Sequence, residues 1–131
     1  MNALANNLFT PRVIYFGIAI VLTLISGALL SFLGRPLNSL VFTVHKLSAV
    51  AAIILIGLSA RNLLKMGDVH LLYLVVTALA GLFLLILVVS GAMLSFDRPV
   101  PQMPLKIHQI LPVLALAAST LSIYLFAASR S

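Results

Sequence analysis

Four long apolar stretches alternate with short polar connectors along most of the chain. A helix needs about 20 mostly apolar residues to cross a hydrocarbon core of about 30 Å, and each stretch is long enough. Charges or Gly/Pro turn signals bound each of them. The pattern therefore predicts one domain, residues 1–131, with four transmembrane helices near residues 13–33, 38–63, 70–95 and 105–127.

The connectors between these stretches are short, so successive helices must be antiparallel neighbours. This predicts an all-α membrane protein, a compact four-helix bundle with both chain ends on one side of the membrane. The chain also repeats itself, because the segment Ser-Gly-Ala-Leu-Leu-Ser-Phe at 26–32 recurs as Ser-Gly-Ala-Met-Leu-Ser-Phe at 90–96. The bundle is thus expected to consist of two tandem parallel helical-hairpin repeats, about 6–63 and about 70–126.

Composition agrees with a membrane protein, since 63% of the residues are apolar and only 8% are charged. No stretch remains for a soluble domain. The absence of cysteine excludes disulfide, iron–sulfur and zinc–thiolate chemistry. The net charge of +6 is typical of anchoring at lipid headgroups, and we expect the lipid bilayer, not nucleic acid, as the surroundings.

A histidine stands nine residues after the matching proline of each repeat, His45 after Pro36 and His108 after Pro99. Each lies about 12 Å below the start of its helix, inside the bilayer. Two hairpins that enter from the same side are related by a pseudo-two-fold axis along the membrane normal, which places both histidines at equal depth. Ionisable groups at that depth usually face the bundle interior and are functional. Two facing imidazoles suit a metal between them, so we predict that His45 and His108 ligate the iron of one haem b per chain.

Other residues at the same membrane face fit a porphyrin. A glycine at histidine depth in the first and third spans would let a flat macrocycle approach the helix. Cations at the interface would bind the two propionates, with the lysine next to the first histidine as the expected partner. These further cofactor-binding candidates are Gly27, Gly91, Lys46, Arg35, Arg98 and Lys106.

Below the histidines, the same faces of the second and fourth spans carry mainly small residues. Small residues let membrane helices approach closely, so we expect the second span to pack tightly on the fourth. Pro112 leaves the carbonyl of His108 without its helical donor, which predicts a kink in the fourth span. The small faces are Ala49, Ala52, Ile56 and Ser59 in one repeat and Pro112, Ala115, Ser119 and Ser122 in the other.

With His45, His108 and the two Ser-Gly-Ala blocks, the pattern resembles the small membrane b-type cytochromes, including the cytochrome b561 family and its four-helix relatives. The resemblance implies a bundle that holds haem b between histidines of different helices and exchanges electrons with quinol or a partner redox protein. Many relatives hold two haems, with a second histidine thirteen or fourteen residues along each ligand helix. Here Ser59 and Ser122 take that place, so one histidine pair and one haem are expected.

Simpler interpretations stand beside this one. The histidines could be a hydrogen-bonded pair inherited through duplication, in a haem-free structural or assembly subunit of a larger membrane complex. A transporter is the weakest alternative, because neither Asp68 nor Asp97 lies within a span. No nucleophile–base set indicates catalysis by side chains, so any enzymatic activity would be that of the haem. For His70, near Asp68 at the opposite face, interfacial hydrogen bonding is expected.

Positive charges are almost balanced between the two membrane faces. If propionates neutralise part of the charge at the histidine face, the terminal side is the more basic one. This favours a bacterial inner membrane protein with both termini in the cytoplasm and the haem near the outer leaflet. Glycine and alanine on outward faces permit a homodimer without requiring one.

Overall fold

The computed structural model describes residues 10–65, 71–96, 99 and 102–128. These residues form four long helices, and all four are long and apolar enough to cross a membrane. A helix satisfies its own backbone polar groups, which lipid cannot do. The four predicted spans are therefore confirmed, with the last helix beginning at Gln102 and not near residue 105. The helices are α2 (Pro11–Leu33), α3 (Ser39–Leu64), α4 (Leu71–Leu94) and α5 (Gln102–Ala128).

Local sequence signals explain where the first hairpin turns. Pro11 occupies the first turn of α2, where a missing N–H costs nothing. Gly34 ends α2 with a positive φ of 71°, a conformation that suits glycine, and its N–H donates to the carbonyl of Leu30. Asn38 then caps α3, because its side-chain oxygen accepts a hydrogen bond from the N–H of Val41 at 3.1 Å.

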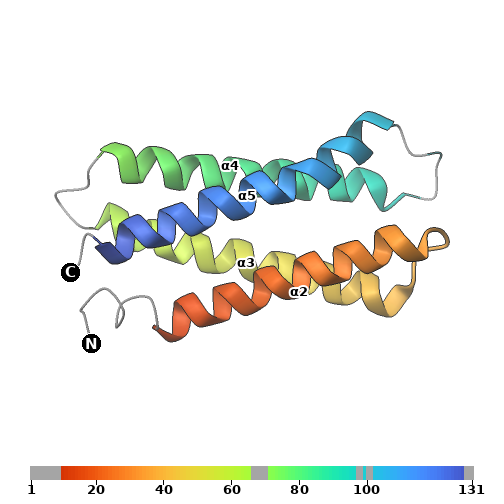
Figure 1. Ribbon diagram of the computed structural model, residues 1–131, viewed down its shortest axis with the longest axis horizontal. Helices are drawn as coiled ribbons and strands as arrows, with labels where there is room; N and C mark the ends of the chain where they lie inside the picture. Colours follow the sequence, from red (N-terminus) through yellow and green to blue (C-terminus); the bar gives the residue numbers. More distant parts are fainter. Residues whose placement is uncertain (1–9, 66–70, 97–98, 100–101, 129–131) are drawn as a thin grey trace.

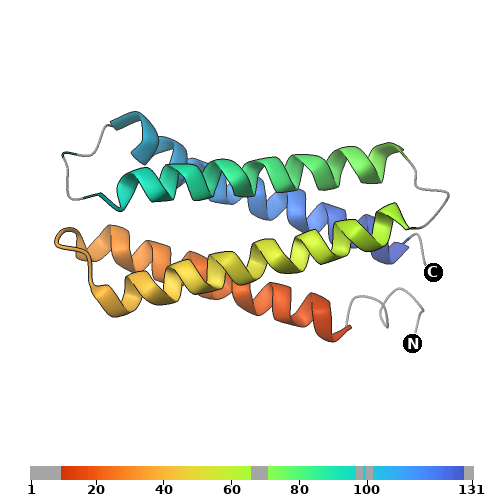
Figure 2. The ribbon, with the colours of Figure 1, turned by 180° about the vertical axis from the view of Figure 1, so that it is seen from behind.

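The bundle consists of two hairpins, α2 with α3 and α4 with α5, that pack closely within themselves and more loosely on each other. Figures 1 and 2 show them one above the other, seen from opposite sides. The start of α2 and the end of α5 lie at one end of the bundle, and the turn between α2 and α3 lies at the other. We call the latter end, which also holds Pro99, the histidine end. The helices meet around the bundle in the order α2, α3, α4 and α5.

Small residues are the most deeply buried at the centre of the bundle, next to the larger Phe16, Ile56 and Leu84, while many other large apolar residues cover its outside. Ala52, Ala80 and Ala115 are almost completely buried. Many large apolar residues such as Ile18, Leu85 and Val113 are exposed and would contact lipid. Lipid tails are as apolar as leucine, so close contact between small residues, not burial of large ones, holds such helices together. The core cluster comprises Phe16, Ala19, Ala52, Ile56, Ala80, Leu84 and Ala115.

The prediction that the second span packs tightly on the fourth is wrong. Ala52, Ala115, Ser119 and Ser122 are buried, so the small faces do point inward. However, α3 and α5 lie diagonally, and the closest neighbour of each is the other helix of its own hairpin. The physical reason is the short hairpin connector, which places α2 beside α3 and α4 beside α5. The small residues therefore meet at the centre of four helices.

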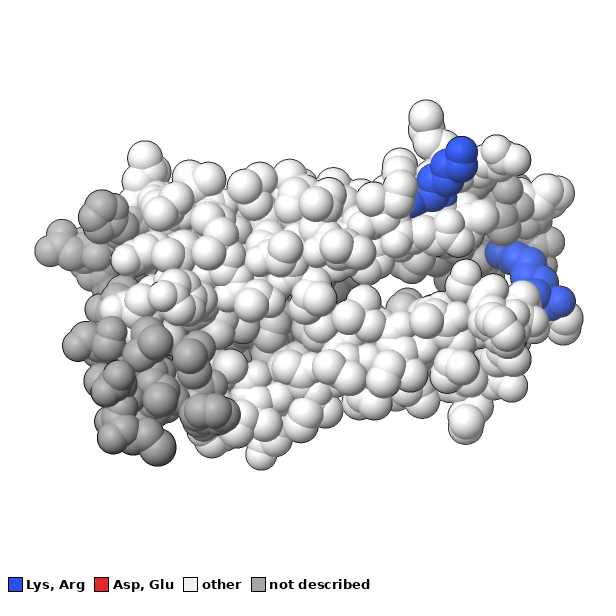
Figure 3. Space-filling view, viewed as in Figure 1, with Lys and Arg blue, Asp and Glu red and all other residues white. Residues whose placement is uncertain are grey.

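The histidine end is packed less densely than the rest. From residue 27 to 47, from 91 to 96, at 99 and from 102 to 114, the described chain contains no buried residue. Figure 3 shows an opening between the two hairpins, on the side of the bundle toward its blue basic residues. The core therefore lies on the terminal side of the histidines, and the hairpins part toward the other end.

Candidate functional site

The two predicted ligands meet across the bundle. His45 comes from α3 and His108 from α5, and the centroids of their rings are 6.1 Å apart. The ring planes make an angle of 74°. Both side chains are half-buried. The diagonal placement of α3 and α5 thus brings one imidazole from each hairpin to the bundle axis at the same level.

The Nδ1 atom of His45 is engaged by the neighbouring helix α2. It lies 2.9 Å from the carbonyl oxygen of Thr23 and 3.3 Å from Oγ of Ser26. A carbonyl oxygen can only accept, so Nδ1 must carry the proton. The neutral ring then has its lone pair on Nε2. The hydroxyl of Ser26 donates to the carbonyl of Leu22, which leaves its oxygen free to accept as well.

His108 is held in the equivalent way by α4. Its Nδ1 lies 2.9 Å from Oγ of Ser90, the repeat counterpart of Ser26. With its proton on Nδ1, as in His45, this ring too presents Nε2 as the free basic nitrogen. A histidine that binds a metal usually donates its other ring N–H in this manner.

Each histidine ring also rests on a glycine of its own hairpin. A Cβ atom added to Gly27 would lie 3.0 Å from Cε1 of His45, and one added to Gly91 would lie 2.9 Å from Cε1 of His108. Any larger residue would displace the ring. The direct neighbour of each glycine is thus an imidazole, and contact between these glycines and a macrocycle remains a prediction.

The separation of the two rings would allow an iron between them. A metal–imidazole bond is about 2 Å long and the ring centre lies roughly 1 Å beyond the nitrogen, so two imidazoles that held one metal between them would have centroids about 6 Å apart. The observed 6.1 Å agrees. Within the described residues, no group of three or more His, Cys, Asp or Glu could hold a metal. Two histidines alone would suit haem iron better than zinc, which needs four ligands.

Three of the predicted propionate partners, Arg35, Lys46 and Lys106, lie at the histidine end but differ in their contacts. Arg35 donates to two backbone carbonyls, those of Phe96 and Leu94, at 3.1 and 2.6 Å. Lys46 is exposed, and its Nζ lies 4.2 Å from the ring centre of Phe42. Their binding to propionates stays a prediction.

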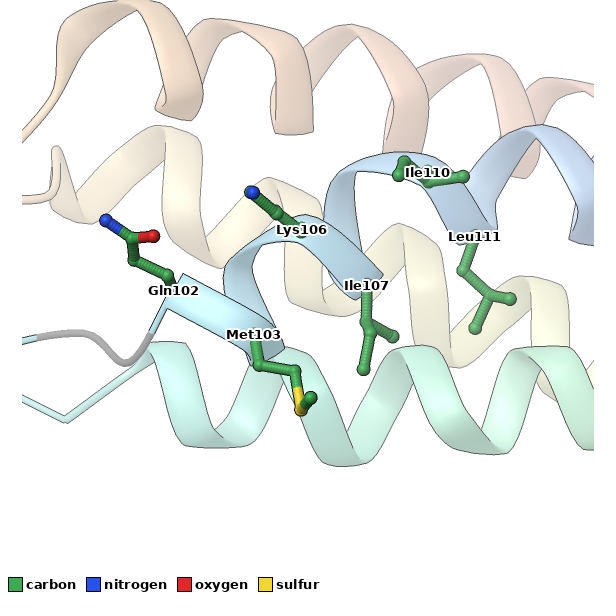
Figure 4. A pocket seen from close by; sticks show the side chains of 6 residues that line it. All are labelled: Gln102, Met103, Lys106, Ile107, Ile110 and Leu111. Atoms are coloured by element: carbon green, nitrogen blue, oxygen red, sulfur yellow. The ribbon is translucent and has the colours of Figure 1, made fainter.

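Lys106 is also exposed and lines a shallow groove of about 480 Å³ on the first turns of α5 (Figure 4). The groove does not include His108, so it is separate from the histidine pair. Its walls are Gln102, Met103, Lys106, Ile107, Ile110 and Leu111. Arg98 and His70 lie outside the described residues.

The serines at the position of a second haem take part in packing. Ser122 is buried and shares a hydrogen bond of 2.6 Å with Thr77 of α4. Ser59 donates to the carbonyl of Leu55 in its own helix at 2.9 Å. In the part of the chain that the structure describes, both serines thus bond within the protein, and the binding of a single haem stays a prediction.

Sequence reasoning missed the supporting serines. Ser26 and Ser90 precede the two glycines in the repeated segments, so their recurrence was visible. Their role was not, because it depends on which face of α2 and α4 meets the histidine of the next helix. Thr23 was hidden for a further reason: it acts through its backbone carbonyl, which every residue has.

Comparisons with protein-family models, with curated proteins and with solved structures find no match to this chain. The resemblance to b-type cytochromes therefore stays a prediction from the histidine pair and the repeated segments. What can be concluded is a four-helix membrane bundle with two imidazoles facing each other across its axis.

Proposed function

We propose that this protein binds one haem b between His45 and His108 and carries electrons in a membrane. The observation that supports this most directly is the ring separation of 6.1 Å, which would allow His45 and His108 to hold one iron between them. Haem, when bound, supplies the one-electron chemistry. The chain's own residues then hold the ligands and exclude water.

The hydrogen bonds of the two rings support the proposal independently of their distance. A proton on Nδ1 makes Nε2 the metal-binding nitrogen of both rings. Because the partners belong to α2 and α4, each hairpin orients its own histidine before any ligand arrives. Such preorganisation reduces the conformational entropy that ligand binding would otherwise cost.

The looser packing at the histidine end is a third supporting observation. A bundle with no cofactor would gain from close helix contact there, as it does around Ala52 and Ala115. Instead, no described residue is buried from 27 to 47 or from 102 to 114, and Figure 3 shows an opening between the hairpins. The proposed electron partners are a quinol in the bilayer or another redox protein at the histidine face.

The test is a visible absorption spectrum of the protein purified in detergent. We expect a Soret band that shifts and sharpens on reduction with dithionite, and its loss in both His45→Ala and His108→Ala, because each substitution would remove one of the two residues that would hold the iron. His70→Ala is the matched control and should keep the spectrum. A well-folded protein that stays colourless with excess haem would exclude the cytochrome and favour a structural subunit.

A further inference from the structure

The turn between α2 and α3 makes a polar contact with the second hairpin. Arg35 donates from its two terminal guanidinium nitrogens to the carbonyls of Phe96 and Leu94, at 3.1 and 2.6 Å. Leu94 is the last residue of α4, so both acceptors lie at the C-terminal end of that helix. Carbonyls at this end have no helical donor, and the helix dipole favours a cation beside them. Arg35 therefore satisfies the end of a helix that belongs to the other repeat.

The contact of Arg35 lies at the end of the bundle where the two hairpins are least tightly packed. Around the core, Ala52, Ala80 and Ala115 hold the hairpins together. At the histidine end the described residues provide no buried contact, and the hairpins part. The separation of the hairpins at that end then depends on what links them across the opening. Among the described residues there, the two histidine rings meet across the bundle, and Arg35 adds two hydrogen bonds between the hairpins.

We propose that Arg35 is a positioning residue that sets the distance between the two hairpins, and with it the distance between His45 and His108. The histidines lie between the core, which acts as the fixed end, and Arg35, which closes the open end. A ligand pair must be held within about 0.5 Å of the binding geometry, so a change of hairpin separation would change the site directly. Gly34, with its φ of 71°, turns the chain immediately before Arg35.

The side chain required is arginine and not simply a cation. The guanidinium group is planar and presents its donors as a fork, so it can reach two carbonyls of one chain at once. A lysine has a single ammonium group on a flexible stem. We therefore expect Arg35→Lys to keep the charge at the end of α4 but to lose part of the constraint, and Arg35→Gln to lose both.

The inference concerns the protein chain itself, so it can be tested without haem. The chain has no cysteine, which allows spin labels at Phe32→Cys on α2 and Met103→Cys on α5, two exposed positions at the histidine end. The distance between the labels is measured by pulsed electron paramagnetic resonance in lipid nanodiscs. We expect Arg35→Gln to shift the mean to a longer distance by more than the width of the parent distribution, with Arg35→Lys between the two.

Arg12→Gln is the matched control, because it removes the same charge from the exposed first turn of α2 at the opposite end of the bundle. It should leave the distance unchanged. An unchanged distance in Arg35→Gln would overturn the inference. A longer distance in a protein that never binds haem would leave the inference standing and remove only the proposed function. Circular dichroism with parent-like helix content shows that each variant is folded.

Discussion

Gly27 and Gly91 each lie directly against a histidine ring, Gly27 against His45 and Gly91 against His108. The closest approach is at Gly91, where an added Cβ would lie 2.9 Å from Cε1 of His108. Real Cβ atoms do not approach so closely, so the ring would have to move. The structure thus gives the repeated Ser-Gly pairs two physical roles. The serine hydrogen-bonds Nδ1 and the glycine leaves room for the ring.

Gly91→Ala adds only one methyl group, but it should displace the ring of His108. Forcing one methyl group into a packed contact costs about 1–3 kcal/mol, and here the displaced group is a proposed ligand. We expect a lower free energy of unfolding and weaker haem binding. Both are measured on the purified protein, by unfolding in mixed micelles and by titration with haem.

Gly81→Ala provides the comparison in the same helix, because nothing lies within 4 Å of its added Cβ. It should be neutral or stabilising, since alanine has the higher helix propensity. If both variants behaved alike, the contact between Gly91 and His108 would have no energetic importance.

At the scale of the helix, the serines of α5 differ in their surroundings although they lie one turn apart. Ser119 is fully buried, and its Oγ has no hydrogen-bond partner in the part of the chain that the structure describes. Ser122 shares a short hydrogen bond with Thr77. A buried hydroxyl without a partner is unfavourable, whereas a hydroxyl paired between helices stabilises their contact.

We accordingly expect opposite effects from two alanine substitutions. Ser119→Ala should raise the free energy of unfolding by about 1 kcal/mol, because it removes an unsatisfied polar group. Ser122→Ala should lower it by about 1 kcal/mol, because Thr77 loses its partner on α5. Equilibrium unfolding by SDS in mixed micelles measures both. A Ser119→Ala variant that is less stable than Ser122→Ala would contradict this assignment.

The helices themselves were predictable from hydropathy and turn residues. Lipid permits only helices across its core in a chain of this kind, so an apolar run of sufficient length becomes a span. Their ends follow from short-range signals such as Gly34 and Asn38. The expected pairing of the second and fourth spans was wrong, because small residues show that a face is buried without showing which helix it meets.

For the whole molecule, the even number of spans places the start of α2 and the end of α5 at one membrane face (Figure 1). The histidine pair lies toward the other face. We propose that the terminal side is cytoplasmic, since part of the opposing positive charge would be neutralised by haem propionates. The four helices are joined by short connectors, so the orientation of one helix in the membrane fixes the orientation of the other three.

A pair of reporters fused after Ser131 tests the orientation. We expect a fluorescent protein that folds in the cytoplasm to be bright and a phosphatase that needs the periplasm to be inactive, because the charge excess retains the terminal side. The same reporters fused within the connector between α2 and α3 should give the reverse result and serve as the control. An active phosphatase after Ser131 would invert the proposed orientation.

By itself, the sequence determined the number of spans, the repeat of the hairpin and the equal depth of His45 and His108. These follow from hydropathy and from residue spacing along helices of known rise. The tertiary structure alone decided that the two rings face each other, that Ser26 and Ser90 hold them, and that Arg35 reaches the other hairpin. The reason is that helices apolar on all sides carry little information about their rotation in lipid, so only the packing of one helix on another selects the inward face.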